Sequence, residues 1–232
     1  MESVINNKDR QIHQILCVSQ NHDETVNIVK KSNRPDLLKV VKIVDRSQIS
    51  TEFGDVSHQS IAVNCSKKSI LSSDDLFSRK DVGNILIFDQ LSDPQNIGAI
   101  IRSAAAFGIK DIVAPSNSFP GETASMVKAS SGNFENIRIY SVNNITNILV
   151  KAKKIGYWCV GLAGESKNTI DKIQEFEKTV LVIGSEGAGI RPLIKKNCDL
   201  LLKIPMASGV ESLNASNAAS IALYELYKGV KS

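Results

Sequence analysis

From residue 84 onward, short apolar runs alternate with helix-like segments, and this alternation constrains the fold more than any other feature of the chain. Several runs are apolar at every position, which is typical of strands buried on both faces. The expected strands are 85–90, 111–114, 137–140, 157–162, 179–183 and 200–205, and the expected helices are 97–107, 123–130, 144–155, 192–196 and 214–228. Strands separated by helices favour a parallel sheet covered on both faces. The sequence therefore predicts an α/β fold for residues 84–232.

The first part of the chain is expected to form a smaller mixed unit over residues 1–66. Its expected strands are 11–18, 39–45 and 58–65, and its expected helices are 23–32 and 47–53. Residues 67–83 turn polar and lose their periodicity, so we expect a linker there, although Ser73 could cap one short helix.

Composition excludes several classes of protein. The chain is 42% hydrophobic with a net charge of +4, and no apolar run approaches the length of a membrane span. The N-terminus lacks the pattern of a signal peptide. The four cysteines are scattered and the three histidines lack metal spacing, so we expect reduced thiols, no metal and a cytoplasmic protein without a membrane partner. The positive charge is spread evenly and by itself does not name a nucleic acid as the partner.

The expected helix 97–107 carries a single charge, at Arg102. A helix that is apolar on nearly every face is usually buried, and a guanidinium is almost never buried without a partner. Arg102 is therefore expected either to form a structural ion pair or to wait in a cleft for an anionic substrate. The helix alone leaves both interpretations open.

Three loops at expected strand ends carry unusual chemistry, and ligands of open α/β sheets bind beyond the carboxyl ends of strands. The first loop, residues 89–96, contains Pro94 and ends at Asn96, which either caps the next helix or belongs to a site. The second, residues 184–189, holds three glycines around Glu186 and matches no common nucleotide-binding motif.

The third loop follows the last expected strand and leads into the C-terminal helix. It begins Ile204-Pro205-Met206, and Ser212 is expected to cap the helix that starts at Asn214. The alanines and serines of that helix give it a slim face, which favours very close packing against a neighbour.

Together, the three segments resemble the motifs of the SpoU-type (TrmH-like) branch of the SPOUT RNA methyltransferases. The first motif is Asp93-Pro-Gln-Asn96-Ile-Gly-Ala-Ile-Ile-Arg102, the second is Gly184-Ser-Glu186-Gly-Ala-Gly189, and the third runs from Ile204-Pro-Met206 to Ser212-Leu213-Asn214-Ala-Ser216. They occur in the family's order and spacing, with Asn-Ala-Ser where Asn-Val-Ser is commoner. Each motif alone is modest, but the ordered set is highly specific.

The resemblance implies a parallel sheet with a deep C-terminal trefoil knot, S-adenosylmethionine bound in that knot, and a homodimer whose active site uses both subunits. It also implies a small L30e-like RNA-binding domain over residues 1–66, which would end in the His-Gln-Gly-like strand start His58-Gln59-Ser60. Relatives usually begin with further residues leading into a first helix, of which residues 1–7 resemble only the end; a shortened start site would explain this.

The implied reaction is methylation of a ribose 2′-hydroxyl in structured RNA, most similar to members that act on a guanosine of large-subunit rRNA. Arg102 would hold the adjacent phosphate and stabilise the developing alkoxide, because an arginine stays protonated and is a poor base. Glu186 would orient Arg102 or the hydroxyl, and Asn96 and Asn214 would position the nucleotide. The residues implied to hold the cofactor are Gly184, Ile204, Leu213, Leu162 and Met206.

Four alternatives remain open at the level of the sequence. The substrate could be tRNA, or the chain could be a non-catalytic RNA-binding assembly factor on the same scaffold. A nicotinamide-dependent oxidoreductase lacks its glycine fingerprint here, and methylation of a base is disfavoured by the Arg-bearing first motif.

Overall fold

The computed structural model describes residues 1–53 and 60–231, and the chain divides into two compact units, Met1–Lys68 and a second unit that begins at Ser69. Residues 69–82, where we expected a linker, belong to the second unit. They contain β4 (Leu71–Ser72), which pairs with another strand, and α4 (Ser73–Ser78). The helix forms because the Ser72 hydroxyl accepts from Asp74 N at 3.1 Å while the Asp75 carboxylate accepts from Ser72 N at 3.2 Å, a capping box.

The first unit is a three-stranded sheet of order β2-β1-β3 with helices packed against it. Strand β1 runs parallel to β2 and antiparallel to β3. Its elements are α1 (Glu2–Asn6), β1 (Ile12–Cys17), η1 (Ser19–Asn21), α2 (His22–Lys31), η2 (Pro35–Val40), β2 (Val41–Ile43), α3 (Arg46–Phe53) and β3 (Ile61–Cys65). The core gathers Ile5, Ile15 and Val29. The expected mixed unit is confirmed, whereas His58 and Gln59 of its expected third strand lie outside the described residues.

The second unit is built on a seven-stranded sheet of order β10-β8-β9-β5-β6-β7-β4, and its strand pairs are parallel, as expected. Beyond β4, its strands are β5 (Ile85–Asp89), β6 (Asp111–Pro115), β7 (Arg138–Val142), β8 (Trp158–Leu162), β9 (Thr179–Gly184) and β10 (Leu200–Leu202). Its other helices are α5 (Pro94–Ala106), α6 (Ala124–Ala129), η3 (Asn133–Asn136), α7 (Ile145–Lys154), η4 (Ile170–Glu175), α8 (Pro192–Asn197) and α9 (Ala215–Lys231).

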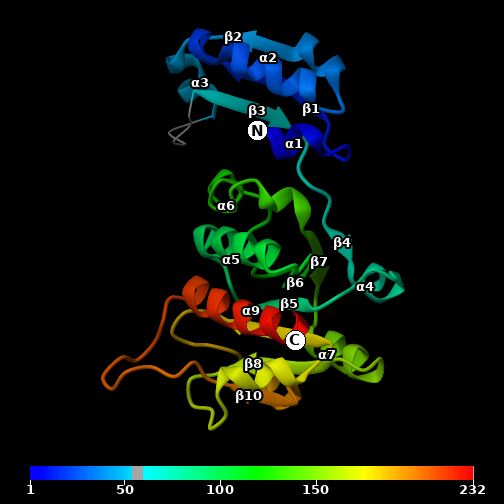
Figure 1. The fold of residues 1–232 in the computed structure, drawn as a ribbon, viewed down its shortest axis with the longest axis vertical. Helices are drawn as coiled ribbons and strands as arrows, with labels where there is room; N and C mark the ends of the chain where they lie inside the picture. The colour runs from blue at the N-terminus through cyan, green and yellow to red at the C-terminus, as the bar shows by residue number, and fades with distance from the viewer. Residues whose placement is uncertain (54–59, 232) are drawn as a thin grey trace. The chain divides into compact units, whose positions relative to one another are not determined.

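Helices cover both faces of this sheet, because alternate side chains of each apolar strand point to opposite sides. In β5, Leu86 and Phe88 join a core formed with α5, α6 and α9, whereas Ile85 and Ile87 join a core formed with α4, α7 and α8. Figure 1 shows α5 and α9 lying along one face and α7 on the other. The continuous apolar pattern thus arises because the strands are buried on both faces.

The packing of α5 against its neighbours requires small residues. A Cβ atom on Gly98 would lie 2.4 Å from the Met126 carbonyl oxygen of α6 and 2.7 Å from the Ala129 Cβ. On the α9 side, the hydroxyls of Ser103 and Ser220 lie 2.7 Å apart, and Ala219 is fully buried. The close packing expected for the slim face of the last helix is confirmed.

Two helix caps differ from our expectations. Asp93, not Asn96, caps α5, because its carboxylate accepts from Gln95 N at 3.0 Å and Asn96 N at 3.4 Å. At the start of α9, the Asn214 side chain, not that of Ser212, accepts from Ser216 N at 2.9 Å. The side chain of Asn96 is therefore available for contacts beyond its own helix.

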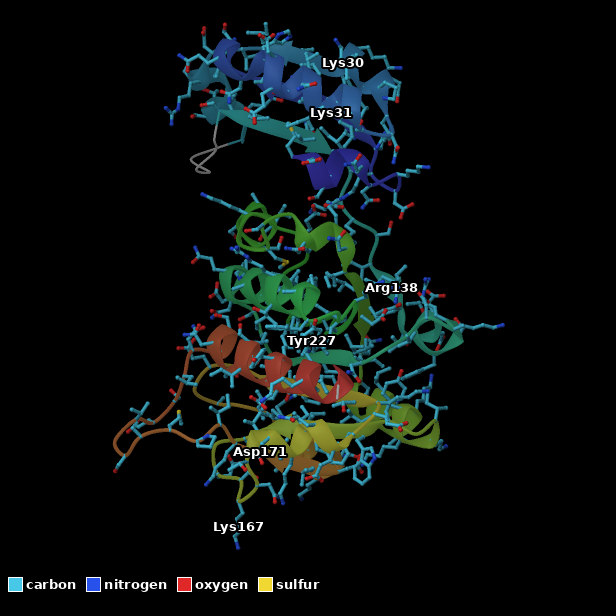
Figure 2. The ribbon with its side chains drawn as sticks, in the orientation of Figure 1. Lys30, Lys31, Arg138, Lys167, Asp171 and Tyr227 are labelled. Atoms are coloured by element: carbon cyan, nitrogen blue, oxygen red, sulfur yellow. The ribbon has the colours of Figure 1, made fainter. Side chains whose placement is uncertain are left out.

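An ionic cluster fixes the amino-terminal edge of the sheet. Asp111 of β6 is buried and accepts from Arg138 Nε at 2.6 Å and from the Tyr140 hydroxyl at 2.9 Å; Arg138 is labelled in Figure 2. Burial, together with the nearby Asp111 charge, raises the pKa of Tyr140 to about 12. Arg138 also pairs with Asp81, whose pKa is lowered to about 2 by hydrogen bonds from Arg138 and Arg79. This cluster joins β6, β7 and the segment before β5 at the edge opposite the three motif loops.

Candidate functional site

A cavity of about 380 Å³ opens at the carboxyl ends of β8, β9 and β10. The last residue of each strand lines it: Leu162, Gly184 and Leu202. Residues 184–189 and the segment after β10, which runs out from the body of the unit and back to α9 in Figure 1, form the rest of its wall. The volume lies in the range of small-molecule sites. Each residue implied by the resemblance to hold the cofactor lines this cavity, namely Leu162, Gly184, Ile204, Met206 and Leu213.

The glycine turn forms the wall of the cavity nearest to β9. A Cβ atom on Gly184 would lie 2.0 Å from the carbonyl carbon of Gly189, so only glycine allows the turn to fold back on the end of the strand. Gly189 N donates to the Ser185 carbonyl at 2.9 Å, and Gly189 has a φ of 65°. The turn consequently presents backbone groups to the cavity and exposes the Glu186 side chain at its tip.

The three motif loops meet at the side chain of Asn214. Its Nδ2 donates to Asn96 Oδ1 at 3.0 Å and to Glu186 Oε2 at 3.2 Å. Its Oδ1 accepts from both Ser216 N and the Ser216 hydroxyl, the latter at 2.6 Å. Because Glu186 also lines the cavity, this junction of two amides and a carboxylate stands at the cavity's edge.

Arg102 is exposed, whereas we expected its helix to be buried on nearly every face. It is exposed on the outward face of α5, beside Gln95 and Ala106, and in the part of the chain that the structure describes no ion pair is recorded for it. It does not line the cavity. The reason is helical geometry: Arg102 lies about 120° around the helix from Asn96 at 100° per residue, so the two side chains leave different faces of α5. A single chain therefore brings together Asn96, Glu186 and Asn214 but not Arg102.

The sequence did not predict several polar residues that lie near the cavity. Lys195 of α8 and Glu165 form an ion pair and both line the cavity, and the hydrogen bond from Lys195 lowers the pKa of Glu165. Asp89, at the end of β5, is fully buried and accepts from Arg191, the residue that follows the glycine turn and Ile190. The one available signal was a carboxylate that ends an apolar strand; nothing in the sequence indicated Arg191 as its partner.

Two structural findings bear on the classes of protein that composition had disfavoured. No helix among the described residues is long and apolar enough to cross a bilayer. Within residues 1–53 and 60–231, no three side chains of His, Cys, Asp or Glu are grouped closely enough to hold a metal ion.

The fold and the cavity define an α/β protein with a cavity of small-molecule size beyond the carboxyl ends of a parallel sheet. A sequence model described as the SpoU rRNA Methylase family matches residues 83–224. A 23S rRNA (guanosine-2′-O-)-methyltransferase RlmB from Coxiella burnetii is 35% identical over 92% of this chain and 86% of its own. A putative TrmH family tRNA/rRNA methyltransferase, YacO, from Bacillus subtilis is 38% identical over 74% of this chain and 70% of its own. The chain belongs to the SpoU methylase family.

Solved structures support the same fold. The crystal structure of the SpoU methyltransferase AviRb from Streptomyces viridochromogenes, in complex with the cofactor AdoMet, aligns with a TM-score of 0.77. The alignment covers 99% of this chain and 87% of that chain at 24% sequence identity. The likeness extends over both units of the chain, each of which therefore has a counterpart in a known structure.

Proposed function

We propose that this protein transfers a methyl group from S-adenosylmethionine to the ribose 2′-hydroxyl of a guanosine in large-subunit ribosomal RNA. The observation that carries the proposal is the junction at Asn214, which joins Asn96 and Glu186 at the edge of an apolar, glycine-walled cavity. Such a junction provides hydrogen-bonding groups next to a compartment of cofactor size. The substrate is inferred from the relatives, whose names give a guanosine 2′-oxygen of 23S rRNA as the site of methylation.

The cavity suits the chemistry of S-adenosylmethionine. Leu162, Leu202 and Ile204 offer apolar contact for a purine ring, while the backbone of the glycine turn offers hydrogen-bonding groups for its edge. The bound cofactor would supply an activated methyl group on its sulfonium. The task of the protein is then to align the acceptor hydroxyl and to assist the loss of its proton.

Arg102 is proposed to hold the phosphate next to the target ribose. A guanidinium offers hydrogen-bond donors and no acceptor, so Arg102 is not proposed to remove the proton itself. A bidentate contact with a phosphate would fix the nucleotide and stabilise negative charge developing on the 2′-oxygen. Asn96 and Asn214 would orient the ribose, and Glu186 would hold Asn214 in place through the hydrogen bond described above.

A homodimer explains why Arg102 stands apart from the cavity in one chain. The outward face of α9 exposes Ile221 and Tyr224, with 37% and 49% of their surface accessible, and the ring of Phe107, at the end of α5, lies 5.7 Å from that of Tyr224. We propose that a second subunit covers this apolar face. Arg102 from one subunit would then complete the site of the other.

The family resemblance supports three further parts of the proposal. The segment from β9 to α9 would form the trefoil knot; in support, β9 is inserted between β5 and β8, so that the chain returns to the interior of the sheet after β8. The first unit would be the L30e-like RNA-binding domain over residues 1–66, and the second unit would be the methyltransferase domain. The protein would act in the cytoplasm, where its ribosomal substrate is assembled.

An in vitro transfer assay tests the proposed function. The full chain is incubated with methyl-labelled S-adenosylmethionine and either unmodified 23S rRNA or bulk tRNA, and the labelled RNA is hydrolysed with alkali. We expect label in an alkali-resistant dinucleotide from one guanosine of the 23S rRNA, because a 2′-O-methyl group blocks cleavage. Label found only in tRNA would show that tRNA, and not rRNA, is the substrate. Cofactor binding without transfer to either RNA would favour a non-catalytic assembly factor.

A further inference from the structure

Asp89 contacts the chain on both sides of the glycine turn, through its buried carboxylate on one side and its backbone on the other. Its Oδ2 accepts from Arg191 N at 2.8 Å and its Oδ1 accepts from Arg191 Nε at 2.7 Å. In the same place, Asp89 is the register partner of Gly184 in the pairing of β5 with β9. The backbone of Asp89 thus lies beside Gly184, which opens the turn, and its side chain binds Arg191, two residues after the turn ends.

Asp89 is also the origin of the first motif loop. The chain leaves β5 at Asp89, passes through Gln90 with a φ of 60°, and reaches Asn96 in the first turn of α5. Asn96 and Glu186, which sit on the two loops that Asp89 connects, both receive hydrogen bonds from Asn214. A displacement of Asp89 would therefore change the distance between Asn96 and Glu186, the two acceptors of the hydrogen bonds from Asn214.

The cost of burying this carboxylate indicates that its contacts are strong. Asp89 is 0% exposed, whereas the Arg191 side chain is 40% exposed. A buried charge is destabilising unless it is paired and hydrogen-bonded, and losing one partner leaves it uncompensated. The carboxylate consequently tolerates little displacement of Arg191.

We infer that Asp89, through Arg191, is a positioning residue for methyl transfer: it sets the distance between the loop that carries Asn96 and the turn that carries Glu186. The inference rests on the proposed function and deepens it. Asp89 touches neither the cavity nor the junction at Asn214, so its effect passes through the backbone of the two loops. Asp89 acts by fixing where the two loops lie and not by contacting the substrate, because its charge is already paired with Arg191.

The chain offers a matched control at the opposite edge of the same sheet. Asp199 has the same kind of contacts, because one oxygen accepts from Cys159 N at 2.8 Å and the other lies 2.8 Å from Lys153 Nζ. It binds β8 near its amino-terminal end, away from the three motif loops. Loss of this pair should lower stability without affecting the site.

The test compares Asp89→Asn, Arg191→Ala, Arg191→Lys and Asp199→Asn in the full chain. For each variant, the melting temperature, the dissociation constant for S-adenosylmethionine and the single-turnover rate on 23S rRNA are measured well below the melting temperature. We expect Asp89→Asn and Arg191→Ala to slow the single-turnover step by about 10- to 100-fold, since displacements near 1 Å are sufficient for such losses. Arg191→Lys should recover part of the rate, and Asp199→Asn should keep the wild-type rate despite a lower melting temperature.

Two results have distinct meanings in this experiment. If Asp89→Asn and Arg191→Ala lower the melting temperature but retain the wild-type rate, as expected for Asp199→Asn, the pair is merely structural and the inference is overturned. If the wild-type protein itself binds no S-adenosylmethionine and transfers no methyl group, the proposed function fails, whatever the variants do.

Discussion

At the scale of single residues, Asn214 is the point where the three motif loops converge. One amide group donates to Asn96 and Glu186 while its oxygen accepts from Ser216. An asparagine is needed because these contacts require two donors and an acceptor on the same short side chain. Arg102, by contrast, makes no contribution to this network within one chain.

Arg102 provides the first residue-scale prediction. Arg102→Ala should leave the affinity for S-adenosylmethionine unchanged, because Arg102 does not line the cavity, but should slow single-turnover methylation by about 10²- to 10³-fold, the usual loss of an electrostatic contact in the transition state. Arg102→Lys should fail as well, since a point charge does not reproduce the bidentate fork. Lys110→Ala, which removes an exposed cation next to the amino-terminal end of β6, serves as the control. Undiminished turnover by Arg102→Ala would remove this residue from the mechanism.

At the scale of elements, the spacing between α5 and α6 depends on a single glycine. In an isolated helix, replacing glycine with alanine is stabilising by about 1 kcal/mol. At Gly98 the added methyl group would meet the Met126 backbone at 2.4 Å, so backbone overlap outweighs helix propensity. The overlap is not easily relieved, because the added methyl group would meet a backbone carbonyl oxygen and not the end of a flexible side chain.

Gly98→Ala is therefore expected to destabilise the protein by about 1–3 kcal/mol, the range found for overpacking. Urea denaturation followed by circular dichroism measures this change. Gly83→Ala is the matched control: a Cβ there has open space, so its effect should stay within about 0.5 kcal/mol. Equal stability of the two variants would show that α5 and α6 can separate freely.

The sequence predicted the elements of the second unit well, because a continuous apolar run and a glycine-terminated helix are local signals. It also predicted which loops would share one edge, since the carboxyl ends of parallel strands lie together. It failed where a partner is distant in the chain. The pair of Asp89 and Arg191 spans 102 positions, and the outward exposure of Arg102 depends on which face of α5 the neighbouring helices α6 and α9 cover.

At the scale of the whole molecule, stability should depend on pH through Tyr140. Its pKa is raised from 10.0 to about 12, first by burial and then by the Asp111 charge. A raised pKa in the folded state means that the neutral phenol contributes stability below pH 10, and that this contribution is lost as the pH rises through 12. The free energy of unfolding of the wild type should therefore fall towards that of Tyr140→Phe between pH 10 and pH 12. A difference between them that stays constant with pH would contradict this assignment.

The proposed dimer gives a second prediction at this scale. Tyr224→Glu places a charge on the exposed face of α9, so light scattering should detect a monomer and methylation should be lost. Trp158→Glu is the matched control, because Trp158 is 48% exposed against 49% for Tyr224 and lies on β8, outside the α5 and α9 face. A Tyr224→Glu variant that remains dimeric would exclude this face as the interface.

We propose that this chain places one methyl group on a ribose of ribosomal RNA, using Arg102. The most direct measurement maps 2′-O-methylation across all cellular RNA in a strain that lacks the gene, with the wild-type chain or Arg102→Ala restored. We predict that one guanosine of the large-subunit rRNA loses its methyl group in the deletion strain and regains it only with the wild-type chain. An unchanged methylation map in the deletion strain would contradict the claim.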